Sequence, residues 1–273
     1  MEEYSPSAKS ARWDWDQSTV LVQCPQQSGL VDHLLRAWPL SDWVPAKNLN
    51  GYLYGGAVKR GDKVLCHACW GGNTGVNCKT TSDESPVLAE ALRSFHASHL
   101  PTRVDACMDW VESGLYDSLA AFMIEFAMNN RLSITQQGDW IRNEGRTLYV
   151  GSKDSVVRLV LYEKGYEQGG NAPREWVRVE VRIRPDRKQR QMVSTWSAET
   201  AFEAGWCADA FSALGWEDLK RKSVGKPWVP SDDERARLAL CKQYKAILEK
   251  WVGEVGTWED LGPAIRRLIE ETA

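Results

Sequence analysis

Three segments between Thr102 and Arg184 alternate apolar and polar residues, and this alternation restricts the fold more than any other feature of the chain. The segments cover residues 102–109, 146–164 and 176–184. Successive side chains of a β-strand point to opposite faces, so each segment is expected to form a strand with one apolar and one polar face. The apolar faces need a cover, which predicts an α+β fold whose antiparallel sheet has helices packed on one face.

The polar face of this predicted sheet gathers acids, arginines and a tyrosine. Its members are Arg103, Asp105, Cys107 and Asp109, then Arg158, Val160, Tyr162 and Lys164, then Arg178, Glu180, Arg182 and Arg184. Carboxylates suit Mg²⁺ or Mn²⁺, basic side chains stabilise charge on a phosphoryl group, and tyrosine can attack phosphorus. The face therefore indicates a metal-assisted phosphodiester site. The competing interpretation is a solvated sheet face whose acids pair with its arginines.

The rest of the chain supplies helices and a change of character after Pro185. Apolar spacing predicts a helix that opens at Ser85-Pro86 and another over residues 115–131. We expect a loose N-terminus over 1–15 and an α+β domain over 16–188 that carries the phosphodiester site. Residues 189–273 are expected to form a smaller, mainly helical C-terminal region that is a candidate for DNA binding.

Composition excludes several classes of protein. The formal net charge is −3, so any nucleic-acid surface must come from local clusters rather than from the whole chain. No apolar run is long enough for a membrane helix, and no signal peptide is evident. Seven cysteines without a secretion signal favour reduced thiols and a cytoplasmic location. The 14 tryptophans either fill cores or, in part, stack on bases.

Four short motifs follow one another along the alternating segments. They are Arg103-Val-Asp105, Tyr149-x-Gly151-Ser152-x-x-Ser155, Leu161-Tyr162-Glu-Lys164 and Trp176-x-Arg178-Val-Glu180. This ordered set resembles the Rep_trans replication initiation factors of rolling-circle plasmids and filamentous phages. The resemblance covers residues 50–185. Upstream, Gly51-Tyr52 and Trp70-Gly71-Gly72-Asn73 are similar to the phage members of the family.

The resemblance implies origin-specific nicking and rejoining of one DNA strand. The family's nucleophile falls on Tyr162, which implies a 5′-phosphotyrosyl intermediate and a free 3′-hydroxyl that primes synthesis. Acids matching Asp105 and Glu180 resemble the ligands of a divalent ion, Mg²⁺ or Mn²⁺, and Asp109 is a third candidate. Lys164 and Arg178 would contact the scissile phosphate or its neighbours.

Further contacts with origin DNA are assigned to residues around these motifs. The candidates are Arg103, Tyr149, Ser152, Lys153 and the basic run Lys220-Arg221-Lys222, for which a solvated helix face is the alternative. A host helicase and a second copy of the chain are further candidate partners, and no membrane partner is expected.

One departure from the family pattern leaves alternatives open. The family usually has an arginine two residues before the nucleophile, where this chain has Val160, although Arg158 on the same strand face could substitute. A non-catalytic, sequence-specific DNA-binding regulator is therefore an alternative function, and a metal-independent tyrosine recombinase or topoisomerase is a third. Tyr149 and Tyr166 are alternative nucleophiles.

A second motif allows a metal site of another kind. Cys66-x-x-Cys69, with Cys78 further along, has the spacing of half a zinc site. The alternative is that these thiols pack as small apolar groups inside a sheet.

Overall fold

The structure is a computed structural model that describes residues 11–170, 172–216, 219–225 and 232–272. The chain divides into two compact units, Met1–Lys226 and Pro227–Ala273. The expected loose segment lies outside the described residues up to position 10. From Arg12 onward the chain is already in a strand, because this stretch pairs with strands on both of its sides.

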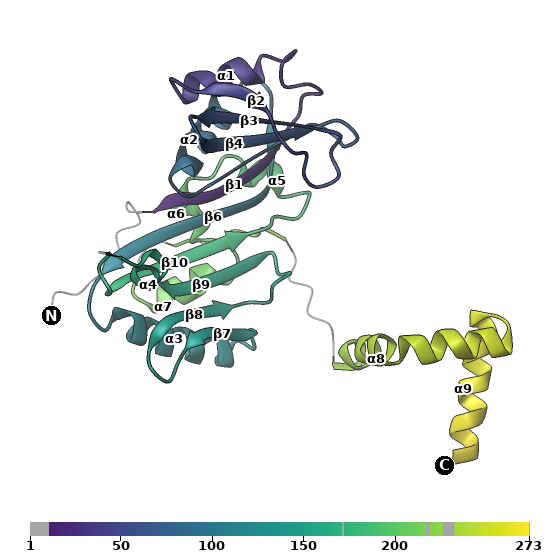
Figure 1. The fold of residues 1–273 in the computed structure, drawn as a ribbon. Coiled ribbons are helices and arrows are strands. Elements are labelled where there is room, and N and C mark those ends of the chain that lie inside the picture. Colours follow the sequence, from purple (N-terminus) through teal and green to yellow (C-terminus); the bar gives the residue numbers. More distant parts are fainter. Residues whose placement is uncertain (1–10, 171, 217–218, 226–231, 273) are drawn as a thin grey trace. The chain divides into compact units, whose positions relative to one another are not determined.

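The first unit is built on one antiparallel sheet with the strand order β2-β3-β4-β5-β1-β6-β10-β9-β8-β7 (Figure 1). In chain order the strands are β1 (Arg12–Val20), β2 (Asp42–Pro45), β3 (Tyr54–Arg60), β4 (Lys63–Trp70), β5 (Val76–Thr81), β6 (His99–Val111), β7 (Ile134–Asp139), β8 (Glu144–Val150), β9 (Val157–Glu163) and β10 (Trp176–Ile183). The three alternating segments lie in β6, in β8 with β9, and in β10. These strands are consecutive neighbours in the sheet, in the order β6-β10-β9-β8.

Helices cover one face of this sheet (Figure 1). They are α1 (Leu30–Ala37), α2 (Ser85–Ser94), α3 (Leu115–Asn129), α5 (Arg190–Val193), α6 (Ala198–Ala201) and α7 (Cys207–Ala213). A 3₁₀ turn over Ser82–Glu84 precedes α2, and the short helix α4 (Lys164–Gln168) follows β9. The predicted α+β class is thereby confirmed.

The core lies between the sheet and these helices and contains the apolar positions that the alternation predicts. Val104, Ala106 and Met108 of β6 are buried there, as are the apolar positions of β9 and β10. A second cluster lies under β1, β3, β4 and β5, against α1 and α2. The opposite, open face is left to the polar residues.

The sheet-bearing unit extends beyond the boundary expected at residue 188. Phe202 and Phe211, from the region that follows, are buried in the same core as β6, β9 and β10. The sequence change after Pro185 marks a change from strands to helices, and these helices belong to the cover of the sheet. The compact unit accordingly continues to Lys226.

The second unit consists of α8 (Asp232–Val255) and α9 (Trp258–Thr272), which confirms the helical character of the C-terminal region. The hydroxyl of Thr257 accepts a hydrogen bond from the backbone N–H of Asp260 and so caps the start of α9. Within the described residues, none of the helices has the length and apolar character needed to cross a bilayer.

The cysteines of the possible zinc motif lie on different faces of the sheet. Cys66 and Cys78 are in the core under the helices, whereas Cys69 is an odd number of strand positions from Cys66 and faces the other way. All three thiols are buried. Among the described residues no group of three or more potential ligands is placed to hold a metal ion. Their placement fits the packing role.

Candidate active site on the open sheet face

The polar side of the central strands contains a cavity of about 520 Å³. Most of its lining side chains come from β6, β8, β9 and β10, with further contributions from β1 and α4. Across β6, β10 and β9 the residues in register are Asp105–Arg182–Arg158, Cys107–Glu180–Val160 and Asp109–Arg178–Tyr162. The antiparallel pairing thus brings Asp105, Glu180 and Tyr162, which are distant in sequence, to one part of one face.

Tyr162 and Glu180 form a direct hydrogen bond in this cavity. The phenolic O–H of Tyr162 donates to Oε1 of Glu180 over 2.6 Å. Burial, followed by the nearby Glu180 carboxylate, raises the pKa of Tyr162 well above its usual value, and the positive charge of Arg178 acts in the opposite direction. The resting phenol is therefore neutral, with its proton directed at a carboxylate that can accept it.

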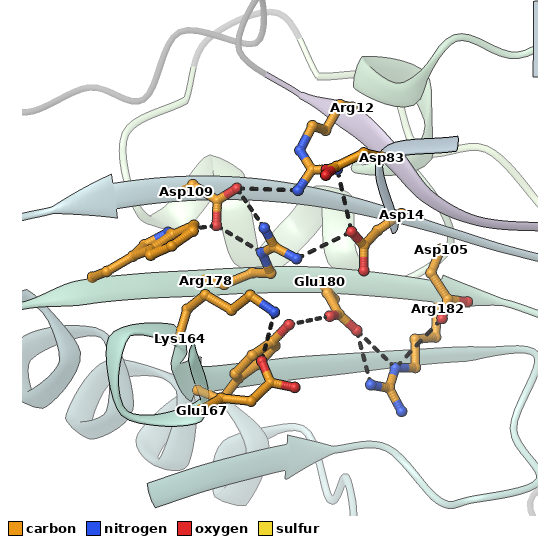
Figure 2. Close-up of polar contacts among 12 residues, drawn as sticks. Arg12, Asp14, Asp83, Asp105, Asp109, Lys164, Glu167, Arg178, Glu180 and Arg182 are labelled. Carbon is orange, nitrogen blue, oxygen red and sulfur yellow. Dashed lines mark hydrogen bonds and ion pairs between the residues drawn. The ribbon is translucent and has the colours of Figure 1, made fainter. Parts of the chain in front are cut away.

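Asp105 and Glu180 converge on the guanidinium group of Arg182. Nη2 of Arg182 lies 2.8 Å from Oε2 of Glu180, and Nε lies 3.6 Å from Oδ2 of Asp105. The two carboxylates are only 3% and 4% exposed, and burial raises the pKa of Asp105 although Arg103 pairs with it. Arg182 therefore lies between two buried acids (Figure 2), and Arg103 supplies a second positive charge beside Asp105.

This donor set fits a divalent cation of the magnesium type. Such ions bind to proteins through one or two carboxylates and fill their remaining positions with water and substrate phosphate oxygens. Asp105 and Glu180 supply two carboxylates directed at one cationic position. Within the described parts of the chain, no third acid, histidine or cysteine joins them to complete a metal cage.

Asp109 belongs to a separate group of ion pairs. It accepts hydrogen bonds from Nε and Nη2 of Arg178, at 2.6 and 2.8 Å, and Nη1 of Arg178 donates to Asp14 over 3.0 Å. Burial opposes the charge of Arg178, but the hydrogen bond with Asp109 and neighbouring negative groups raise its pKa overall. Asp109 is four positions along β6 from Asp105, about 13 Å of strand. The structure does not bring Asp109 to the two acids around Arg182.

Basic and aromatic side chains surround Tyr162. Nζ of Lys164 lies 5.6 Å from the centre of the Tyr162 ring and donates to Glu167 over 2.6 Å. The guanidinium of Arg158 lies 4.0 Å from the ring centre of Tyr149. Both Lys164 and Tyr149 line the cavity. Arg158 stacks on Tyr149 beside it, and burial lowers its pKa.

Val160, the departure from the family pattern, is only 1% exposed. It lies in register between Glu180 of β10 and Tyr149 of β8. Val160 thus lines the cavity but contributes no charge to it. The guanidinium groups that approach this area come from Arg158 and Arg182 instead.

The remaining residues expected to bind DNA lie in two places. Ser152 and Lys153 are exposed in the turn after β8, and the carbonyl oxygen of Lys153 accepts a hydrogen bond from Arg184. The basic run 220–222 lies instead on the helix-covered side of the unit. There Arg221 forms an ion pair with Asp209 of α7, and Lys222 forms one with Glu203. The structure does not bring this run into the cavity.

Three residues of the site were not assigned from sequence. Asp14 lies in the stretch expected to be loose, although Trp13-Asp14-Trp15-Asp16 alternates apolar and polar residues and could have indicated a strand. Glu167 lies in the short helix α4, where it accepts a hydrogen bond from Lys164. Arg182 shares the alternating face with Glu180, so its position was predictable, but its contact with two acids depends on strand register.

Comparison with known proteins gives matches to replication proteins. The rolling circle replication initiator protein from Geobacillus stearothermophilus has a similar solved structure, with a TM-score of 0.47 and 17% sequence identity over 68% of this chain and 77% of that one. No curated protein matches the sequence. The resemblance found in the sequence is confirmed from position 103 onward, and the upstream part expected to share it, 50–102, lies outside the match. Residues 103–213 match the model of the Rep_trans family, the replication initiation factors.

Proposed function

We propose that this protein initiates rolling-circle replication by nicking and rejoining one DNA strand through Tyr162. The observation that carries the proposal is the 2.6 Å hydrogen bond from the Tyr162 hydroxyl to Glu180, inside a cavity that also contains Lys164 and Arg182. The match of residues 103–213 to replication initiation factors supports the same reading.

In the proposed reaction Tyr162 Oη attacks the phosphorus atom of a phosphodiester. Its proton passes to Oε1 of Glu180 as the bond from Oη to phosphorus forms. The bond from phosphorus to the 3′ oxygen breaks, and that oxygen takes up a proton from solvent. The products are a 5′-phosphotyrosyl link and a free 3′-hydroxyl. Rejoining reverses these steps and returns the proton from Glu180 to Tyr162.

The charged neighbours stabilise the charge that develops in this reaction. Arg178 lies directly across the strand pair from Tyr162 and favours its ionised form, so it assists the loss of the phenolic proton. Lys164, at the cavity wall, and Arg158, beside Tyr149, are the groups we assign to the phosphate. We assign Tyr149, Ser152, Lys153 and Arg103 to the adjoining DNA.

Asp105 and Glu180 are the residues that would hold Mg²⁺ or Mn²⁺, and Asp109 is kept as a more distant candidate. When bound, such an ion supplies polarisation of a phosphoryl oxygen. The proposed substrate is origin DNA that is single-stranded at the nick, in the cytoplasm. A host helicase, a second copy of the chain, and duplex contact by the basic run 220–222 remain parts of the proposal.

The test is to look for covalent attachment of the protein to DNA. Purified protein is incubated with supercoiled DNA carrying its origin and Mg²⁺ or Mn²⁺, and adducts are detected after denaturation. We expect Tyr162→Phe to abolish the adduct and the nick while leaving origin binding within about twofold, since only the nucleophilic oxygen is lost.

Two matched variants complete the experiment. Tyr149→Phe and Tyr166→Phe each remove a different phenol and should still form the adduct. An adduct that persists in Tyr162→Phe and disappears in either control would assign the nucleophile elsewhere. Strand cleavage that resists EDTA would instead indicate a metal-independent tyrosine recombinase or topoisomerase.

One observation favours a second function, a non-catalytic DNA-binding regulator. Both proposed metal ligands are paired with arginines, and Val160 provides no charge at the position where the family usually has one. Sequence-specific origin binding without nicking, with either metal ion present, would decide for this function.

A further inference from the structure

A second cavity, of about 570 Å³, lies on the N-terminal half of the sheet. It is lined by β1, β5 and β6, by the loops around Asn50 and Asn73, and by the connector that follows β10. Two lining residues, Arg187 of that connector and Arg190 at the start of α5, lie within the segment that matches the family. All the other lining residues precede residue 103 and lie outside that segment.

The charges of the two cavities differ. The first is lined by several acids, including Asp105 and Glu180, together with basic residues. In the second, the charged lining residues are Arg187 and Arg190, and no carboxylate is present in the lining that the structure describes. Such a surface attracts an anion such as a phosphodiester.

The remaining wall of the second cavity is rich in side-chain amides. Asn77 is only 6% exposed, and its orientation is fixed by a hydrogen bond from Gln17 (3.2 Å) and one that it donates to Thr19 (3.5 Å). Asn73 donates to the backbone carbonyl of Asn50. Amides present a donor and an acceptor side by side, which suits the hydrogen-bonding edges of unpaired bases.

The two cavities are adjacent along β1. Trp15 lines the first and Gln17 lines the second, on the same face and two residues apart, or about 7 Å. Lys79 lies in register with Gln17, and its Nζ is 4.2 Å from the ring centre of Trp15, over which Arg103 also lies at 4.0 Å. Positive charge and an aromatic ring therefore mark the path between the cavities.

We propose that the second cavity binds a nucleotide of the single-stranded DNA next to the nick, with Arg187 and Arg190 on its phosphate and the Asn73 and Asn77 amides on its base. Trp15 and Lys79 guide the strand from one cavity to the other. This assignment rests on the proposed function, because it takes single-stranded DNA as the substrate.

Fluorescence anisotropy with labelled oligo(dT), oligo(dA) and oligo(dC) at several salt concentrations tests the phosphate contacts. Arg187→Gln and Arg190→Gln should each weaken binding of all three oligonucleotides roughly tenfold, the effect of one lost charge-assisted hydrogen bond. Each should also reduce the salt dependence of log Kd by about 0.7, the share of one phosphate contact with a single strand.

Lys188→Gln is the matched control. Lys188 carries the same charge on the same connector but does not line the cavity. An equal loss of affinity in Lys188→Gln would show general electrostatic attraction and would overturn the proposed site.

The amides are tested by base preference. Wild-type protein should distinguish the three oligonucleotides, and Asn73→Ala and Asn77→Ala should reduce the differences among their Kd values. Asn73 is exposed, so its variant remains informative if loss of the buried Asn77 disturbs folding. Unchanged preference in a folded Asn73→Ala protein, or no preference in the wild type, would remove the base-reading role.

The adduct assay separates failure of this inference from failure of the proposed function. If wild-type protein forms the Tyr162 adduct but the arginine variants bind like wild type, the second cavity has no role in binding. If no adduct forms but the arginine variants still lose affinity, the cavity is a DNA site on a protein that does not nick.

Discussion

At the scale of single residues, the contact between Tyr162 and Glu180 predicts how the pKa of Tyr162 depends on its neighbour. The Glu180 carboxylate raises the pKa of Tyr162 through its charge and as hydrogen-bond acceptor. Glu180→Gln removes the negative charge, so the pKa of Tyr162 should fall, although burial keeps it above that of a free tyrosine. Ultraviolet titration of tyrosinate, with Tyr162→Phe as the reference that lacks this phenol, measures the change.

The same variant tests the role of Glu180 in the reaction. Loss of a general base typically lowers a rate by about 10²–10⁴-fold, so nicking by Glu180→Gln should fall by that order. Origin binding should remain. Unchanged nicking with a lowered Tyr162 pKa would show that Glu180 affects the phenol without receiving its proton.

A second residue, Asp16, predicts how stability depends on pH. Its side chain is 2% exposed, on the helix-covered face of β1, and burial raises its pKa to about 6 despite a hydrogen bond from Ser18. Between the unfolded value of 3.8 and about 6 the folded state binds more protons. The contribution of Asp16 to the free energy of unfolding is therefore fully present below pH 4 and decreases as the pH rises towards 6.

Asp16→Asn should remove this part of the pH dependence, which is on the order of 3 kcal/mol. Urea unfolding at pH 4 and at pH 7 gives the two free energies of unfolding for each protein. Asp42→Asn, at an exposed position of β2, controls for the loss of one negative charge. A variant that keeps the wild-type difference between the two pH values would refute the assignment to Asp16.

At the scale of elements, one face of β9 packs in the core and the other lines the cavity. Leu161 is fully buried in the core, and Tyr162 next to it faces the cavity. Leu161→Ala should lower the free energy of unfolding by about 2–5 kcal/mol, because it leaves a void in a packed interior. Urea denaturation measures the loss, and Val64→Ala, at a 37% exposed position of β4, should cost much less.

The strands also show what the sequence could predict at this scale. The alternating patterns of β6, β9 and β10 are long and regular, so their faces followed directly from a period of two. β1 was missed although Trp13, Asp14, Trp15 and Asp16 alternate apolar and polar residues in the sequence. A β-bulge between Trp13 and Trp15 shifts their register, so that Trp13 lies in the core and Trp15 lines the cavity. An irregular strand is defined by its partners more than by its own pattern.

At the scale of the whole molecule, the division into two units predicts independent stability. The unit Met1–Lys226 contains the ten-stranded sheet and both core clusters. Among the described residues of the second unit, Leu261 is the buried apolar side chain. A chain ending at residue 226 should therefore keep the main thermal unfolding transition of the full protein, as measured by calorimetry.

The shortened chain also tests where the C-terminal helices act. If they contribute to origin recognition, the shortened protein should cleave single-stranded origin oligonucleotides and form the Tyr162 adduct while its affinity for the origin duplex falls. Equal duplex affinity in the two proteins would remove the C-terminal unit from the proposed DNA contacts.

The sequence by itself determined the antiparallel sheet, its two faces, and the presence of Asp105, Tyr162 and Glu180 on the polar one, because strand periodicity is a local property of the chain. Only the tertiary structure decided that β1 lies between β5 and β6, that Arg182 joins Asp105 to Glu180, and that a second cavity adjoins the first. These relations depend on the register between strands that are distant in sequence. The physical reason is that burial and ion pairing are set by neighbours across the sheet.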